Sequence, residues 1–227
     1  MPTERPDGFC PCGRLPPALG SETVAPGRGS VNGPGARRFS LAISEGDGIS
    51  IIAEVREPEA AQLAESDGAE GVLVSSGYEE RLSGIREAVS VPVLFYWDGQ
   101  QADRIQGADA CVVGAAAWSE TDDESEYAHK VLDRDFELAL RVEDEEQLEE
   151  AMERFDPDLF VLAAEDDEAL ERVLDLLPDV PAGKLVVAEL PRISRADVEE
   201  LESAGVDAVI VRAGNIAELT GEPPPEV

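Results

Sequence analysis

Eight short apolar runs recur along the chain, and their starting points are 18 to 27 residues apart. They begin near Ile51, Gly71, Pro92, Ala110, Glu137, Leu159, Leu185 and Ala208. Their length and their content of β-branched residues predict buried strands. In the first run, residues 51–56, alternation places Glu54 and Arg56 on one face of the strand and Ile51, Ala53 and Val55 on the other.

Segments with the spacing of amphipathic helices lie between these runs. The spacing predicts helices at residues 58–67, 78–89, 120–132, 145–155, 167–177 and 195–204. The segment at residues 100–106 shows the pattern most weakly, and a further short helix is predicted at residues 39–45, below the first strand. Gly68, Gly107 and Gly205 stand where three of these segments should end, just before a strand.

The alternation of strands and helices predicts an α/β fold, a (β/α)8 TIM barrel with reduced loops over residues 38–221. Residues 1–37 are rich in Pro, Gly and Ser and lack apolar periodicity, which predicts a disordered tail, and residues 222–227 form a C-terminal tail. An open doubly wound sheet is the alternative, but it often carries a glycine-rich phosphate turn after its first strand. Here that strand runs into Arg56, Glu57 and Pro58, with no glycine.

The charge balance is strongly acidic, with 50 Asp and Glu against 18 Lys and Arg and a net charge of −32. Such a surface repels nucleic acid and anionic membranes, so we expect neither as a partner. The acid excess and the scarcity of lysine indicate either a halophilic host or a GC-rich genome that encodes Arg in place of Lys. No basic segment followed by an apolar core opens the chain, so we expect no signal peptide and a cytoplasmic protein.

Cysteine and histidine are too few for a disulfide framework or a zinc centre. Cys10 and Cys12 form an isolated C-x-C in the predicted tail, and His129 is the single histidine of the chain. Cys111 lies inside an apolar run, which predicts a small buried hydrophobe. We therefore expect no metal and no cofactor.

Several stretches resemble the indole-3-glycerol-phosphate synthase family. Residues 51–56, I-I-A-E-V-R, resemble its first strand, and residues 85–94, 107–117, 138–148, 185–189 and 204–211 are similar to stretches at its third, fourth, fifth, seventh and eighth strands. The resemblance covers residues 39–220 and implies the barrel fold and a role in tryptophan biosynthesis. It also implies a carboxy-lyase that closes an indole ring by decarboxylation and dehydration of a phosphorylated anilino sugar.

The resemblance ends at the residues that carry this chemistry. The general acid of the family, a lysine at the end of the third strand, corresponds to Tyr96 here, and its general base, a glutamate on the fifth strand, corresponds to Arg141. A neutral tyrosine could donate a proton, but an arginine cannot accept one at any useful pH. The base is missing unless Glu143 or Glu165 has taken its role, so we expect the ring-closing activity to be lost.

Other site positions of the family differ as well. Arg56 replaces the substrate-contacting lysine of the first strand, and Arg212 replaces the eighth-strand glycine that meets phosphate. The S-P-S loop after the first strand is absent, and the S-G pair after the seventh strand is L-P. Glu54 and Glu189 are retained. The candidate catalytic residues are therefore Glu54, Tyr96 and Glu189.

Charged side chains should gather where the strands end, and Asp98 and Glu165 belong to this group. One interpretation is a fork-like site for a small anionic metabolite, a phosphate or a carboxylate, held by Arg56, Arg141 and Arg212. The other is a set of ion pairs that fills the mouth of the barrel.

In the ion-pair interpretation, Glu54 and Glu189 balance Arg56 and Arg141 across the lumen. Mouth loops poor in glycine favour this interpretation, because close backbone approach to phosphate usually needs glycine. The adjacent Tyr96 and Trp97 either stack a flat ligand or simply cap the barrel.

Three functions follow from these observations. The first is a divergent barrel of the synthase family without ring-closing activity. The second is a non-catalytic binding or assembly subunit that keeps the barrel as a scaffold. The third is a different barrel enzyme or binder that acts on a small anionic metabolite.

Overall fold

The computed structural model describes residues 39–44, 46, 48–97, 106–118, 137–212, 214 and 216–219. The chain divides into two units, residues 1–34 and 35–227, and all the described residues belong to the second. Several sequence predictions fall outside the described residues: both tails and their boundaries, Cys10, Cys12, Asp98, His129, the helix at 120–132 and most of the segment at 100–106. They stay predictions.

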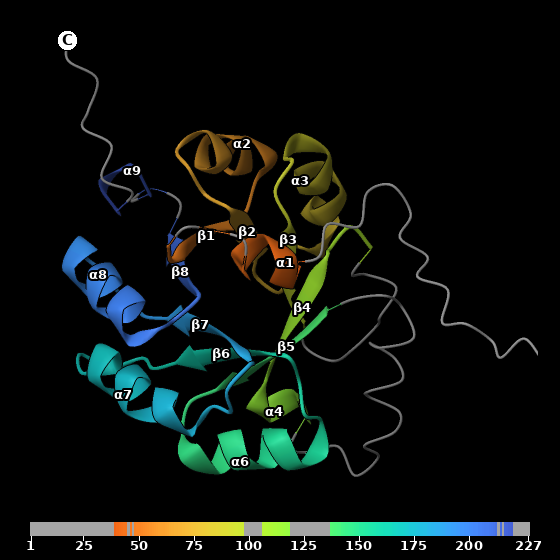
Figure 1. The fold of residues 1–227 in the computed structure, drawn as a ribbon. Coiled ribbons are helices and arrows are strands. Elements are labelled where there is room, and N and C mark those ends of the chain that lie inside the picture. Colours follow the sequence, from red (N-terminus) through yellow and green to blue (C-terminus); the bar gives the residue numbers. More distant parts are fainter. Residues whose placement is uncertain are drawn as a thin grey trace, which may run out of the picture. The chain divides into compact units, whose positions relative to one another are not determined.

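The described residues form a closed barrel of parallel strands in chain order, with β8 paired to β1 (Figure 1). The strands are β1 (Ser50–Val55), β2 (Gly71–Val74), β3 (Val93–Tyr96), β4 (Ala110–Gly114), β5 (Glu137–Val142), β6 (Leu159–Ala163), β7 (Leu185–Glu189) and β8 (Ala208–Arg212). Each lies at one of the eight apolar runs. The predicted (β/α)8 barrel is confirmed.

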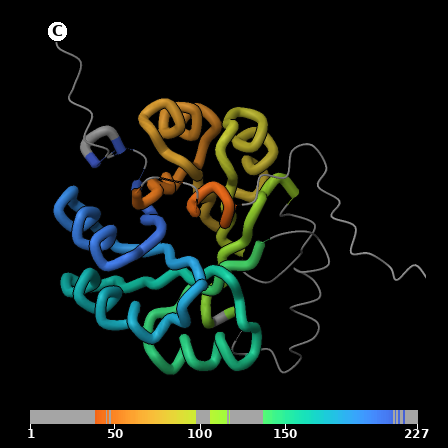
Figure 2. The backbone as a smooth tube through the Cα atoms, in the orientation of Figure 1, coloured from red at the N-terminus to blue at the C-terminus, as the bar shows by residue number. Residues whose placement is uncertain are grey.

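The described helices surround the strand ring, apart from the one that precedes the first strand, and those between two strands return the chain from one to the next (Figure 2). They are α1 (Phe39–Ser44), α2 (Pro58–Ser66), α3 (Leu82–Ala88), α4 (Ala115–Trp118), α6 (Glu145–Arg154), α7 (Ala169–Leu176), α8 (Arg195–Ala204) and α9 (Ile216–Leu219), with 3-10 turns η1 (Glu79–Arg81) and η3 (Leu177–Asp179). The helix predicted at 78–89 therefore begins as a 3-10 turn, and the one predicted at 167–177 starts two residues later.

Local signals in the sequence explain where these helices begin and end. Asp144 caps α6 by accepting a hydrogen bond from the Gln147 amide, and Ser194 caps α8 in a reciprocal capping box with Asp197. Gly205 ends α8 at a φ of 95°, a left-handed conformation that glycine adopts without strain.

Strand alternation divides the apolar side chains between two cores. Ile51, Ala53 and Val55 pack with the outer helices, whereas Ile52 belongs to the cluster that fills the lumen. Each of these four side chains is at most 6% exposed. The faces predicted for the first strand are therefore confirmed, and the lumen is a packed interior rather than a channel.

The helix α1 closes the amino-terminal end of the barrel, as predicted, and Figure 1 shows it across the middle of the strand ring. Phe39 and Ile43 are buried in the lumen cluster. The amide and hydroxyl of Ser40 each donate a hydrogen bond of 2.7 Å to the Glu137 carboxylate at the start of β5.

Within the described part of the chain, every helix is too short or too polar to cross a bilayer. The cytoplasmic location stays a prediction.

Candidate functional site

One layer of side chains at the carboxyl-terminal end of the lumen is polar. Glu54, Tyr96, Arg141 and Glu189 come from the alternate strands β1, β3, β5 and β7 and share the inward face of each strand. In a barrel of this kind, four inward residues from alternate strands form one layer. We call these four residues the polar layer. Two residues earlier on the same strands lie Ile52, Leu94, Ala139 and Val187, all fully buried.

Glu189 is held from two sides within the polar layer. The Tyr96 hydroxyl donates a hydrogen bond of 2.5 Å to Glu189 Oε2, and Arg141 Nε donates one of 2.6 Å to the same oxygen. These charge-assisted bonds span the mouth from β3 and β5 to β7. The three side chains therefore constrain one another.

Arg141 is enclosed by carboxylates. Besides Glu189, its Nη1 contacts Glu143 and its Nη2 lies 3.6 Å from Glu165. The Arg141 side chain is 18% exposed, whereas Glu165 is 82% exposed. The structure thus places a guanidinium, surrounded by acids, where the family resemblance implies a general base.

The environment fixes the protonation of Tyr96 and Arg141. Burial raises the pKa of Tyr96, and the neighbouring Glu189 raises it further, so the phenol keeps its proton. Burial alone would lower the pKa of Arg141, but the charge and the hydrogen bond of Glu189 outweigh it and the net shift is upward. Neither group accepts a proton near neutral pH.

Glu54 stands in a different environment, although it belongs to the same layer. The Ser75 hydroxyl donates a hydrogen bond of 2.8 Å to Glu54 Oε1, and Arg56 Nη2 lies 3.8 Å from that oxygen. The Arg56 side chain is 62% exposed, and its guanidinium lies 5.4 Å from the centre of the Tyr78 ring. Arg56 therefore sits on the rim, just beyond β1.

The ion pairs predicted for Glu54 with Arg56 and for Glu189 with Arg141 are both present. The second crosses the mouth as expected, but the first runs along the end of a single strand. Arg212 ends β8, is exposed, and stands beside Glu54 in the strand register. The three predicted anion-binding arginines do not converge, because Arg141 lies on β5 whereas Arg56 and Arg212 lie at β1 and β8.

The two adjacent aromatic residues, at the end of β3, point to opposite sides of the barrel wall. Tyr96 faces the lumen, and Trp97 is 4% exposed and packs in the outer core. A cavity of about 180 Å³ lies beside them, lined among the described residues by Ser75, Ser76, Tyr96 and Trp97. The sequence reasoning missed Ser75 and Ser76, although a serine pair directly after the apolar run of β2 was a usable signal.

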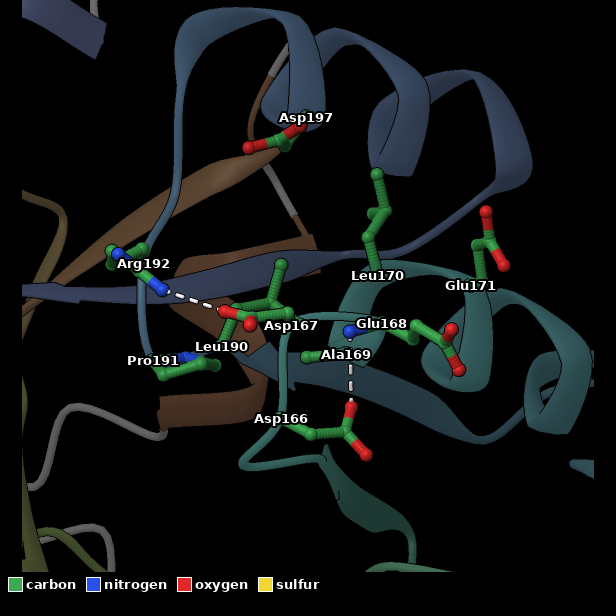
Figure 3. A pocket seen from close by; sticks show the side chains of 10 residues that line it. All are labelled: Asp166, Asp167, Glu168, Ala169, Leu170, Glu171, Leu190, Pro191, Arg192 and Asp197. Atoms are coloured by element: carbon green, nitrogen blue, oxygen red, sulfur yellow. Dashed lines mark hydrogen bonds and ion pairs between the residues drawn. The ribbon is translucent and has the colours of Figure 1, made fainter.

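A second cleft, of about 350 Å³, lies between the start of α7 and the loop after β7 (Figure 3). Its lining residues are Asp166, Asp167, Glu168, Ala169, Leu170, Glu171, Leu190, Pro191, Arg192 and Asp197. Arg192 Nη2 pairs with Asp167 Oδ1 at 2.7 Å, as the dashed line in Figure 3 marks. This acidic cleft, which the sequence reasoning also missed, disfavours phosphate at the end of β7.

Cys111 is fully buried, as predicted, and burial raises the pKa of its thiol to about 12. Among the described residues, no group of three or more His, Cys, Asp or Glu side chains could hold a metal ion.

The chain is similar to several indole-3-glycerol phosphate synthases, whereas no family model matches it. It is 32% identical to that of Neisseria meningitidis over 194 residues, which cover 76% of this chain and 73% of that enzyme. It is 29% identical to that of Chlorobaculum tepidum over 216 residues, covering 81% and 83% of the two chains. For the enzyme of a Geobacillus strain the identity is 29% over 168 residues, with 66% of this chain and 64% of that enzyme covered.

Solved structures with this fold include thiamine phosphate pyrophosphorylase from Pyrococcus furiosus, with a TM-score of 0.58 and 16% identity, covering 75% of this chain and 89% of that one. Phosphoenolpyruvate phosphomutase from Streptomyces platensis has the same TM-score and 18% identity, covering 80% and 82%. These likenesses concern the fold alone.

Proposed function

The chain belongs to the indole-3-glycerol phosphate synthase family, and we propose that it is a member that does not close the indole ring. The observation that carries this proposal is the enclosure of Arg141 by Glu143, Glu165 and Glu189. Ring closure in the family depends on a proton acceptor at this position. A guanidinium held among three carboxylates stays charged and cannot serve as one.

The neighbouring carboxylates are poor substitutes for the missing base. Glu143 directs an oxygen at Arg141, and Glu165 is 82% exposed. Glu189 accepts both of its short hydrogen bonds on one oxygen, which fixes it between Tyr96 and Arg141. General base catalysis requires an acceptor within hydrogen-bond reach of the reacting proton. In this proposal none of the three acts as the base, because each carboxylate lies against the Arg141 guanidinium.

The test is an assay for indole formation from the phosphorylated anilino sugar that the family uses. A synthase such as the Chlorobaculum tepidum enzyme is the positive control. We expect no turnover above the protein-free rate at any pH from 5 to 9. Turnover that disappears in a Glu143→Gln or Glu165→Gln variant would show that another carboxylate acts as the base and would overturn the proposal.

A second role, the binding of a small anion, is favoured by one observation. Arg212 is exposed beside Glu54 at the β8–β1 edge, where no described residue pairs with it, and Arg56 is exposed nearby on the rim against Tyr78. Exposed guanidinium groups are suited to a carboxylate or a phosphate. We propose that this edge, without Arg141, is where such an anion binds. A non-catalytic assembly subunit of the same pathway is the alternative.

Thermal shift measurements with inorganic phosphate and with acetate test the anion role. We expect stabilisation in the wild-type protein and in an Arg172→Ala control on α7, and its loss in Arg212→Ala. Equal stabilisation in all three would assign the effect to ionic strength. If no anion binds and the protein elutes from a sizing column only together with a second protein, the role as an assembly subunit is favoured.

A further inference from the structure

Opposite charges alternate along the β8–β1 edge of the mouth. Arg212 ends β8, Glu54 stands beside it on β1, and Arg56 follows two residues later. Neighbouring strands lie about 4.8 Å apart. A cationic and an anionic recognition group are therefore presented side by side at the open rim.

Glu54 retains hydrogen-bonding capacity on one of its two oxygens. Its Oε1 accepts the Ser75 hydroxyl and faces Arg56, whereas no hydrogen bond or ion pair from a described residue reaches its Oε2. The side chain is 27% exposed, so a ligand can reach it. A free carboxylate oxygen accepts only, and the matching ligand group is a donor such as an ammonium.

A ligand with a single charge satisfies only part of this edge. A simple anion that approaches Arg212 also meets Glu54, and a simple amine that approaches Glu54 also meets both arginines. A molecule that carries an ammonium and a carboxylate on one carbon satisfies both groups at once. Complementary placement of both charges is what gives electrostatic specificity.

The cavity beside Tyr96 adjoins Glu54, because Ser75 both lines it and donates a hydrogen bond to Glu54, and its size limits what else the ligand carries. At about 180 Å³ it lies below the 300–1,000 Å³ typical of sites for drug-sized ligands. Its described lining combines two serine hydroxyls with two aromatic side chains. This combination suits a short side chain that is apolar or carries a hydroxyl.

We propose that the β8–β1 edge binds a small zwitterion of the α-amino acid class. Its carboxylate binds Arg212, its ammonium binds Glu54, and its side chain enters the cavity lined by Ser75, Ser76 and Tyr96. This inference rests on the anion-binding role proposed above for the same edge and adds the ammonium site.

The test screens the twenty L-amino acids by thermal shift and measures Kd for the most stabilising one by calorimetry. The corresponding amine without the carboxylate and the corresponding acid without the ammonium are measured alongside. We expect the zwitterion to bind on the order of 10-fold more tightly than either analogue, as expected for one lost charge-assisted hydrogen bond.

Two variants localise the site. Glu54→Gln should weaken the zwitterion about 10-fold and leave the acid analogue unchanged or tighter, because the neutral amide no longer repels the acid. Glu87→Gln, on the exposed surface of α3, removes the same charge and should change nothing. If the acid analogue and the zwitterion bind with equal affinity, the anion-binding role is supported and the ammonium site is refuted. If no amino acid stabilises the protein, the inference fails.

Discussion

The two halves of the barrel mouth carry the same kinds of side chain and use them differently. In the closed half, Arg141 and Glu189 lie within a network that Tyr96 completes, and Arg141 is 18% exposed. In the open half, Arg56 and Glu54 form a looser pair at 3.8 Å, and Arg56 is 62% exposed. A guanidinium and a carboxylate can therefore serve as structure on one side and as a candidate ligand site on the other.

Burial and the number of partners decide between these two uses. A partly buried ion pair must keep all its contacts, because losing one partner leaves a charge poorly solvated. An exposed pair contributes little and can exchange its partner for a ligand. The closed half thus supports the proposal that the base is lost, and the open half is where we expect binding.

Removal of the Arg141 side chain should have the largest effect. In Arg141→Ala, Glu189 loses its guanidinium while it remains partly buried, and we expect about 2–3 kcal/mol of lost stability. Urea unfolding at fixed salt measures this change. Replacing both members, as in Arg141→Leu with Glu189→Leu, should recover most of it. A loss below about 0.5 kcal/mol in the single variant would mean that the closed half behaves like a surface pair.

The Tyr96 phenol should make stability fall in strong alkali. Burial and Glu189 raise the pKa of Tyr96 above its ordinary value near 10, so above that pH the unfolded chain binds fewer protons than the folded protein. The free energy of unfolding should then fall by up to about 1.4 kcal/mol per pH unit.

Tyr96→Phe should remove that part of the slope, which unfolding curves between pH 9 and 11 measure. The Cys111 thiol, whose pKa is raised to about 12, adds a fall of the same sign that begins near pH 9, so the comparison is made in a Cys111→Ala background. An unchanged slope after Tyr96→Phe would contradict the closed network.

Ser75→Ala should have a smaller effect, because it removes one hydrogen bond to a partly exposed carboxylate. We expect about 1 kcal/mol of lost stability in urea unfolding. The conservative Ser75→Thr variant keeps the hydroxyl and serves as the control. Equal losses in both variants would indicate packing rather than the hydrogen bond to Glu54.

Arg56→Ala should change stability least, by about 0.5 kcal/mol or less at low salt. In 1 M salt, where the Debye length shrinks to about 3 Å, the difference should vanish. The loss of stability in Arg141→Ala should persist in 1 M salt. If salt abolished both costs equally, the distinction between the two halves would be wrong.

The positions of the strands and of the polar layer were predictable from the sequence, because local patterns determine them. Apolar runs located all eight strands, and alternation placed Glu54 on the inward face. The pairing of Glu189 with Arg141 followed from their equivalent places at strand ends. These features depend on the backbone periods of strand and helix rather than on long-range packing.

Other features of the mouth could not be predicted from the sequence. The enclosure of Arg141 depends on where Glu143 and Glu165 turn after β5 and β6, which no local pattern specifies. The cavity near Ser75 and the acidic cleft at α7 are spaces between loops, and such spaces arise only when distant segments come together.

A single-turnover reaction, with this protein in excess over the phosphorylated anilino sugar and indole fluorescence as the signal, tests most directly whether a base is present. Under these conditions even one slow ring closure per molecule is visible. With a guanidinium in place of the proton acceptor, we expect no indole beyond the protein-free control over hours. Complete conversion of the bound substrate by the wild-type protein would contradict it.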